Sequence, residues 1–300
     1  MKKLMLIFIA VLSITIMNSC VEQETSSCEE ESFTFAFLTD IHLQPERNAT
    51  EGFRAAITEV NVLKPDFVIT GGDLVMDVLG VSYGRADSLY NLYAEEVKGF
   101  DMPVYNTLGN HEVFGIYESS GISPDHPEYR YGMFESRIGE TYYSFDYEGW
   151  HFMVLNSVQE TEDRRYIGMI GEEQMDWIRT DLMELDPNTP IIVSTHIPFI
   201  TVFTQILYGE YAPDYHGLVV ENAREVLDLF AGYKLKLVLQ GHLHYLEDIY
   251  VYETHFITAG AVSGSWWNGP YNEVEEGFLM VHVKGDDFCW EYVDYAWEVE

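Results

Sequence analysis

The sequence is poor in cysteine and in basic residues. Its three cysteines include no CxxC pair, which argues against a zinc site built from thiolates. Only 16 basic side chains stand against 50 acidic ones, a formal net charge of -34. A surface of that charge repels nucleic acid and anionic lipid, so we expect no nucleic-acid partner. Two explanations of the acidity stay open: bound divalent cations that locally reverse the field, or a role in solubility alone.

No apolar run is long enough to cross a bilayer comfortably. The longest, from Leu4 to Met17, is shorter than the about 20 residues that a span needs, and it follows two lysines as in a secretory signal. Ser19 and Cys20 resemble the end of a bacterial lipoprotein signal, in which the cysteine carries the lipid. We therefore predict a signal peptide over 1–19 and an acidic tether over 20–32. The protein would be exported, periplasmic or on the surface of a bacterial envelope, and would contact the membrane through its N-terminal lipid only.

From Phe33 onward, short apolar β-rich runs alternate with helix-like segments. The runs cover 33–39, 67–70, 104–107, 191–195, 235–240 and 255–258. Apolar residues at helical spacing predict helices over 50–63, 172–185 and 222–233, and two hairpins are predicted over 142–156 and 277–295. This alternation indicates an α/β fold with buried sheets. No linker is visible, so we expect one domain over 33–300.

Polar residues with metal-ligating side chains follow five of these runs directly. They are Asp40, His42, Asp73, Asn110, His196, His242 and His244. Sites in open α/β sheets gather at the carboxyl ends of strands, so five strand ends can deliver these residues to one place. In an extended segment residues i and i+2 point to the same side, which lets Asp40 and His42 grip one ion and lets His242 and His244 approach one site together. Carboxylate, amide and imidazole ligands suit borderline divalent metals.

Each motif alone is weak, because D-x-H arises often by chance and G-N-H-E can be a polar turn. In this order, and each after a strand, they are specific. The series Asp40-x-His42, Gly72-Asp73, Gly109-Asn110-His111-Glu112, His196 and Gly241-His242-x-His244 resembles the calcineurin-like metallophosphoesterases, over about residues 33–260. The resemblance implies a four-layer α/β/β/α sandwich of two mixed sheets with a dinuclear metal site at the carboxyl ends of the strands.

The resemblance also implies a role for each site residue. Two divalent ions, such as Mn, Fe or Zn, would be bound, the first by Asp40, His42 and His244 and the second by Asn110, His196 and His242. Asp73 would bridge both ions, since a carboxylate has two oxygens to share. A hydroxide held between the metals would attack a phosphoester, and His111 would be the general acid that protonates the leaving group.

Fewer residues indicate which branch of the family the chain resembles. Purple acid phosphatases have a tyrosine where this chain has Met76, and the pattern is closer to bacterial cyclic-nucleotide and glycerophosphodiester phosphodiesterases. The expected partner is therefore a small-molecule phosphoester, either a monoester or a diester. The open alternatives are a catalytically inactive binding lipoprotein on the same fold and a mononuclear metal hydrolase.

Some residues outside the motif series have two interpretations. The Trp266-Trp267 pair is either an aromatic wall at the site entrance or, more commonly for such pairs, a packed pair. His216 is a candidate substrate contact, and Asp77 is interpreted as a surface carboxylate. A disulfide between Cys28 and Cys289 is open. The remaining histidines outside the motifs are interpreted as structural; they are His126, His151, His255 and His282.

Overall fold

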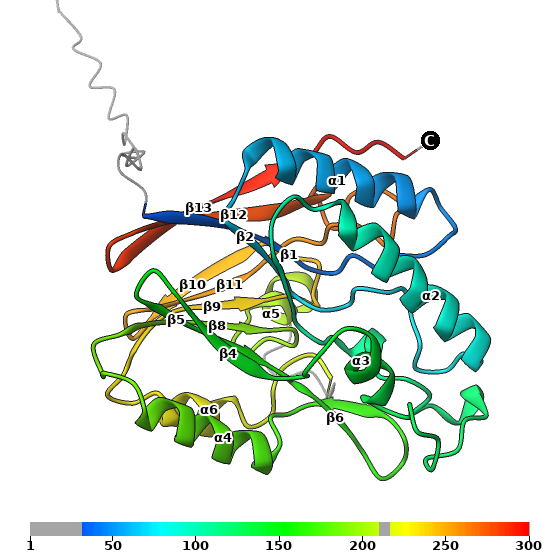
Figure 1. The fold of residues 1–300 in the computed structure, drawn as a ribbon, viewed down its shortest axis with the longest axis horizontal. Helices are drawn as coiled ribbons and strands as arrows, with labels where there is room; N and C mark the ends of the chain where they lie inside the picture. The colour runs from blue at the N-terminus through cyan, green and yellow to red at the C-terminus, as the bar shows by residue number, and fades with distance from the viewer. Residues whose placement is uncertain (1–31, 210–216, 300) are drawn as a thin grey trace, which may run out of the picture.

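The computed structural model describes residues 32–209 and 217–299, and two mixed sheets dominate it (Figure 1). The first sheet has the strand order β13-β12-β1-β2-β3 and the second has the order β10-β11-β9-β8-β5-β4. The strands of the first sheet are β1 (Phe33–Leu38), β2 (Phe67–Thr70), β3 (Val104–Asn106), β12 (Gly277–Lys284) and β13 (Asp287–Asp294). Those of the second are β4 (Tyr143–Tyr147), β5 (Trp150–Leu155), β8 (Pro190–Thr195), β9 (Lys234–Gln240), β10 (Glu247–Val251) and β11 (Thr254–Thr258).

Helices cover the outer face of each sheet. Figure 1 shows α1 (Ala49–Leu63) and α2 (Tyr83–Glu96) against the first sheet, and α4 (Glu172–Met183) and α6 (Ala223–Leu229) against the second. The predicted four-layer α/β/β/α sandwich is confirmed. The smaller elements are α3 (Gly132–Arg137), α5 (Phe203–Tyr208), the β6–β7 ribbon (Val158–Glu160, Tyr166–Gly168) and three 3-10 turns (Val97–Gly99, Asn110–Glu112, Glu118–Ser120).

Aromatic rings from both sheets fill the space between them. Phe35 of β1 stacks on Phe67 of β2 with ring centroids 5.2 Å apart, and both meet Phe152 of β5 edge-on at 5.7 and 5.5 Å. All three side chains are buried. Contacts of this kind add stabilisation beyond the area that they bury, so the relative position of β1, β2 and β5 is well defined.

The strands that precede the candidate ligands run parallel within each sheet. β1, β2 and β3 pair in parallel in the first sheet, and β5, β8 and β9 do so in the second. Their carboxyl ends therefore reach the same edge of the sandwich. This arrangement is the one that the alternating sequence pattern predicted.

Two predicted helices are shorter than their periodicity suggested. The helix predicted over 222–233 ends at Leu229, shortly before Gly232, whose φ of 92° is incompatible with a helix. The helix predicted over 172–185 ends at Met183, and Pro187 follows. Helix α2 was not predicted, although Ser82 caps its N-terminus by accepting a hydrogen bond from the Arg85 backbone N–H at 3.4 Å.

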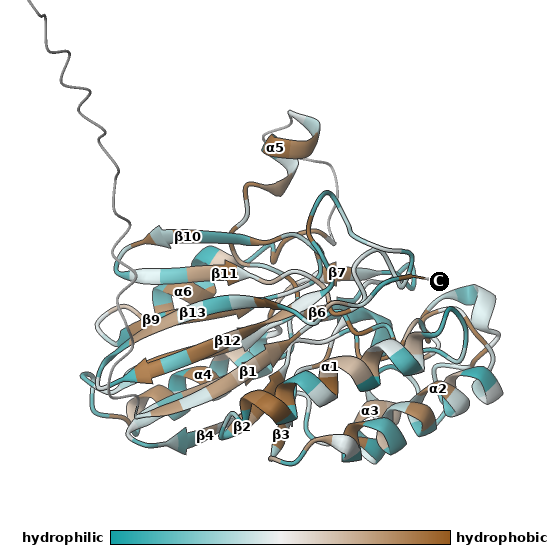
Figure 2. Ribbon diagram, turned by 90° about the horizontal axis from the view of Figure 1, so that it is seen from above, coloured by the Kyte–Doolittle hydropathy of each residue, from teal (hydrophilic) through white to brown (hydrophobic). Residues whose placement is uncertain are grey.

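Helix α5 stands away from the two sheets (Figure 2) and exposes Ile206 and Tyr208. In the part of the chain that the structure describes, no helix combines the length and apolar character needed to cross a membrane. The predicted signal peptide, almost the whole tether, Cys28 and His216 lie outside the described residues.

Candidate metal centre

Six of the seven predicted ligands form two clusters at one edge of the sandwich, and the seventh, Asn110, lies beside the second cluster. The first cluster is Asp40, His42 and His244, and the second is Asp73, His196 and His242; within each, one potential ligand atom per residue lies within 4.8 Å of the others. The structure therefore brings together the residues that the motif series predicted.

Short distances connect the members of each cluster. In the first cluster, Nε2 of His244 lies 3.2 Å from Oδ1 of Asp40 and 3.0 Å from Nε2 of His42. In the second, Nε2 of His196 lies 3.2 Å from Oδ2 of Asp73 and 3.1 Å from Oδ1 of Asn110.

Asp73 lies between the two clusters. Its Oδ2 atom is 3.7 Å from Nε2 of His42 in the first cluster, besides its contact with His196 in the second. His111 completes a further group with His42 and Asp73, and its Nε2 is 3.8 Å from Oδ2 of Asp73. A carboxylate in this position is able to face two cations at once.

Five of the seven candidate ligands have a left-handed backbone. Their φ angles are 55° at Asp40, 46° at His42, 52° at Asp73, 72° at His242 and 50° at His244. Such conformations cost about 1–3 kcal/mol each for non-glycine residues and persist only where the surrounding structure fixes them. Strain of this kind clusters at functional sites, and here it turns each chain segment sharply after its strand.

Two glycines of the motifs allow the strand ends to approach one another. A Cβ on Gly109 would lie 2.2 Å from the backbone nitrogen of Asp73, and one on Gly241 would lie 2.1 Å from Oγ1 of Thr39. These separations are far below van der Waals contact. Any side chain at either position would therefore push Asp73 or the segment before Asp40 out of place.

Backbone carbonyls fix the orientation of three imidazole rings. Nδ1 of His196 donates to the Gly71 carbonyl at 2.8 Å, Nδ1 of His244 donates to the Gly264 carbonyl at 2.5 Å, and Nδ1 of His111 donates to the Met76 carbonyl. In the neutral form of the His196 and His244 rings, Nε2 then carries the lone pair and points toward the centre of the site. Metal-ligating histidines commonly have such a partner on the second ring nitrogen.

The donor set fits divalent cations. The Nδ1 atoms of His42 and His242 are buried and have no hydrogen-bond partner among the described residues. Nε2 of His42 also lies 3.0 Å from Nε2 of His244, and the buried carboxylate of Asp40 lies beside them. This group has more lone pairs than hydrogen-bond donors. Burying unpaired polar atoms is costly, and cations bound between the clusters would satisfy those ring nitrogens and carboxylate oxygens that face the clusters.

The electrostatics favour anionic carboxylates at Asp40 and Asp73, and they divide the imidazoles into neutral and protonated ones. Burial raises the pKa of Asp40, but the neighbouring His244 lowers it by more, and the same balance with His111 and His196 lowers the pKa of Asp73. Burial lowers the pKa of His42, and it lowers that of His242 to about 4. Both are then neutral at pH 7, as metal ligation requires. Burial also lowers the pKa of His196, but the carboxylates of Asp73 and Asp40 raise it by more, to about 9, so a cation that binds this ring has to displace a proton.

Glu112 is a functional residue whose role the sequence did not reveal. Its buried carboxylate accepts backbone N–H bonds from Asp73 at 2.9 Å and Gly109 at 2.8 Å on Oε2, and from Val75 at 3.0 Å on Oε1. Glu112 thereby joins the segment after β2 to the segment after β3. The only signal was its place directly after Asn110 and His111 in the motif.

Asp77 is not the simple surface carboxylate that we expected. It is half-buried, and its Oδ1 accepts a hydrogen bond from the Leu79 backbone N–H at 2.7 Å. Burial lowers the pKa of His111, but the carboxylates of Asp73 and Asp77 raise it by more. Asp77 thus belongs to the surroundings of His111.

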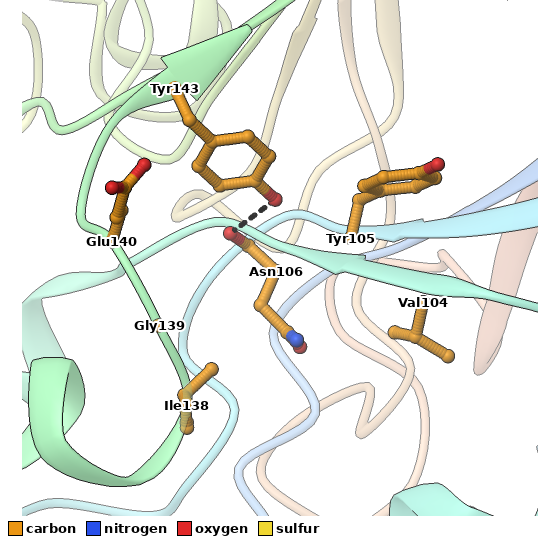
Figure 3. Close-up of a pocket in the computed structure, with 7 residues that line it drawn as sticks. All are labelled: Val104, Tyr105, Asn106, Ile138, Gly139, Glu140 and Tyr143. Carbon is orange, nitrogen blue, oxygen red and sulfur yellow. Dashed lines mark hydrogen bonds between the residues drawn. The ribbon is translucent and has the colours of Figure 1, made fainter. Parts of the chain in front are cut away.

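The end of β3 is fixed by tyrosines. The Asn106 side-chain oxygen accepts from Tyr93 at 2.5 Å and Thr70 at 3.1 Å, and its backbone carbonyl accepts from Tyr143 at 3.1 Å (Figure 3). Figure 3 shows Asn106 and Tyr143 at a pocket between β3 and the start of β4, which has a volume of about 240 Å³. None of the candidate ligands lines this pocket. The hydrogen bonds to Asn106 bear on the site because they fix the end of the strand that leads to Asn110.

The histidines outside the motifs have ordinary structural partners. His151 lies between the carboxylates of Asp146 and Asp181, at 2.7 and 2.8 Å. His255 pairs with Asp248, His282 lies 3.4 Å from Glu291, and His126 packs against Tyr83 and Phe114.

The fold and the converging Asp, Asn and His side chains define a metallohydrolase of the α/β/β/α type. The family model of the calcineurin-like phosphoesterases matches residues 33–246, and the chain belongs to this family. It is a phosphoric ester hydrolase that depends on divalent metal ions. The family resemblance inferred from the motifs is confirmed.

Relatives with assigned names agree on phosphoester chemistry and differ in substrate. A probable cyclic nucleotide phosphodiesterase of Pseudoalteromonas sp. (strain SM9913) is 31% identical over 88% of this chain and 92% of its own. The serine/threonine-protein phosphatase CPPED1 of Bos taurus is 28% identical over 63% of this chain and 57% of its own. A dimetal phosphatase from Danio rerio has the same fold, with a TM-score of 0.63 and 15% identity over 89% of this chain and 98% of its own.

Proposed function

We propose that the protein hydrolyses small phosphoesters with two divalent ions, the first held by Asp40, His42 and His244 and the second by Asn110, His196 and His242. Asp73 would bridge the ions. The observation that carries this proposal is the position of Asp73, whose Oδ2 lies near an imidazole of each cluster at 3.7 and 3.2 Å. Bound cations of this kind polarise phosphoryl oxygens and supply a water of low pKa as the nucleophile.

His111 is the proposed general acid. Its side chain is partly exposed, at 19%, whereas those of His42 and His196 are buried, so His111 is able to reach an incoming ester. The hydrogen bond from Nδ1 to the Met76 carbonyl leaves Nε2 on the side of Asp73. A proton on Nε2 would pass to the departing alkoxide oxygen.

A substrate panel tests this function. The metal-loaded protein is assayed against phosphomonoesters, cyclic nucleotides, glycerophosphodiesters and aryl phosphates, and the assays are repeated after chelation. We expect turnover of at least one ester class by the loaded protein and none by the chelated protein. Absence of turnover for every class, in a protein shown to hold two ions, would instead indicate a binding protein that has lost the chemistry.

The same proposal places the enzyme outside the cytoplasm on a lipid attached to Cys20. It is supported by the two N-terminal lysines, the short apolar run and the Ser19-Cys20 pair. A Cys20→Ala variant should leave the membrane fraction and lose the mass of the lipid. A variant that stayed membrane-bound at unchanged mass would contradict lipidation.

A further inference from the structure

A tryptophan side chain lies directly against the first cluster. The ring centroid of Trp266 is 4.5 Å from that of His244 and 5.9 Å from that of His42. Tyr271 meets the Trp266 ring nearly edge-on, at 5.9 Å and 78°, and lies 5.7 Å from His244. Trp266 and Tyr271 thus form an aromatic corner beside two of the proposed metal ligands.

The two consecutive tryptophans differ in burial. Trp267 is 1% exposed and belongs to the core, whereas Trp266 and Tyr271 each keep part of their surface in contact with solvent. The interpretation as a packed pair therefore holds for Trp267 only. The aromatic corner is available to a molecule that approaches the site.

The buried tryptophan fixes the position of the exposed one. The indole N–H of Trp267 donates to the backbone carbonyls of Ile41 and His42 at 3.0 and 3.1 Å, which ties this loop to the segment that carries the first cluster. On the other side, Arg47 donates to the carbonyl of Trp266 at 3.0 Å. The aromatic corner is therefore pre-organised, which reduces the entropy lost when a ligand binds.

Backbone strain also marks this position. Trp266 has a φ of 50° and Trp267 one of 66°, values that are rare for bulky residues. Left-handed residues cost free energy and are retained where the surroundings require them, most often at ligand-binding and active sites. Positive φ also occurs in turns away from the site, such as at Tyr252 and Glu253, so at Trp266 the strain supports the contact geometry and does not replace it.

We propose that Trp266, with Tyr271 beside it, stacks on a planar aromatic group of the substrate, so that the enzyme prefers small phosphoesters that carry a nucleobase or a similar ring. This inference rests on the proposed function. Stacking on indole suits every base, because each has a π face, and tryptophan offers a large rigid surface. The net charge of -34 disfavours nucleic-acid polymers, which leaves small molecules such as nucleoside phosphates.

The ring system adjoins the proposed chemistry. The imidazole of His42, which Trp266 contacts, also meets the ring of His111 edge-on at 4.6 Å. The ring of His42 therefore has Trp266 at 5.9 Å and the proposed proton donor His111 at 4.6 Å, so a phosphoester bound between the clusters would have both groups near it.

The test compares two esters that differ only in the base. Adenosine 5′-phosphate and ribose 5-phosphate are used as monoesters, and their methyl esters serve as the diester pair. The variants are Trp266→Ala and Trp266→Phe, and the control is Trp177→Ala, since Trp177 is a half-buried indole of α4 that packs on Tyr142. Metal content is measured for every variant.

We expect Trp266→Ala to lower kcat/KM for the adenosine ester by about 10- to 100-fold, mainly through KM, as is usual for loss of a base-stacking ring. The ribose ester should change by less than about threefold, the size of an ordinary surface substitution effect. Trp266→Phe should retain most of the preference, and Trp177→Ala should retain all of it.

Two results would overturn the inference. An equal loss on both esters together with lost metal would show that Trp266 only orients His244, and an unchanged preference would show that the base does not contact the ring. If the wild-type protein turned over neither ester, the proposed function would be in doubt for these substrates. The stacking would then be tested by measuring the affinity of both proteins for adenosine 5′-phosphate by calorimetry. Weaker binding by Trp266→Ala supports stacking, and equal affinity of the wild type and the variant overturns it.

Discussion

Replacing Glu112 by glutamine should destabilise the protein and weaken its metal centre without changing the shape of the side chain. The carboxylate of Glu112 accepts three backbone N–H bonds, two on Oε2 and one on Oε1. A glutamine has one acceptor oxygen. If that oxygen replaces Oε2, it keeps the bonds from Asp73 and Gly109, and its NH2 group then faces the buried N–H of Val75.

The size of the effect follows from these contacts. An unpaired buried N–H costs about 1–3 kcal/mol. Burial and the neighbouring Asp73 raise the pKa of Glu112 to about 7, so above pH 7 each of the two remaining bonds also loses a charged acceptor, which adds about 1–2 kcal/mol together. We therefore expect about 2–5 kcal/mol of lost stability, a large share of the about 5–15 kcal/mol typical of a domain. Because Glu112 positions Asp73 and Gly109, metal affinity or turnover should fall by about 10- to 100-fold, the usual effect of altering the groups behind a metal ligand.

Urea unfolding followed by tryptophan fluorescence, with metal analysis and turnover of the same samples, measures both effects. Glu96→Gln is the matched control. Glu96 is also buried, but it accepts hydrogen bonds from Arg54, which is 60% exposed, and it lies outside the metal centre. We expect the control to lose about 1 kcal/mol or less and no metal. If Glu112→Gln lost no more than the control and kept normal turnover, the role assigned to Glu112 would be wrong.

Three further predictions concern single side chains. Asp73→Asn should lose bound metal and orders of magnitude in kcat, as measured by elemental analysis and initial rates, because one carboxylate would serve two ions; normal metal and turnover would refute the bridge. His111→Ala should lower the turnover rate of alkyl phosphoesters about 10²–10⁴-fold and that of aryl esters much less, with metal retained. If the rate loss did not depend on the pKa of the leaving group, under conditions where bond cleavage limits the rate, the role of His111 as general acid would be refuted. Burial lowers the pKa of His151, but Asp181 and Asp146 raise it by more. The protonated ring therefore stabilises the folded protein fully below the pKa of about 6.5 that histidine has in the unfolded chain, and this stabilisation is lost as pH rises through the higher pKa of the folded state. His151→Gln should therefore cost about 1–3 kcal/mol near pH 6 and less near pH 9 in urea titrations; an equal cost at both pH values would show that the ring is not charged.

The candidate ligands were predictable because each stands directly after a short apolar strand. Asp40 follows β1 and His196 follows β8, and parallel strands bring their carboxyl ends to one edge whatever the loops between them do. The spacing of the D-x-H and H-x-H pairs then added chemical specificity. Local pattern and topology were sufficient for this part of the site.

The supporting contacts were not predictable, because they join residues that are far apart in the chain and leave no periodic trace. Trp267 donates to the carbonyl of Ile41, some 226 positions earlier, and Glu112 binds the backbone of Asp73, 39 positions earlier. Helix α2 was missed for a different reason. Polar residues interrupt its apolar positions, and its buried face includes Tyr90, Tyr93 and Glu96 beside Ala86 and Leu89.

The metal stoichiometry of the active enzyme tests the central claim most directly. The protein is stripped by chelation and titrated with Mn²⁺, and bound metal and phosphoester turnover are measured on the same samples. Two clusters that share Asp73 predict that turnover rises with occupancy of the second site and levels off at two ions per chain. Full turnover at one ion per chain, or turnover that persists in the stripped protein, would contradict the dinuclear account.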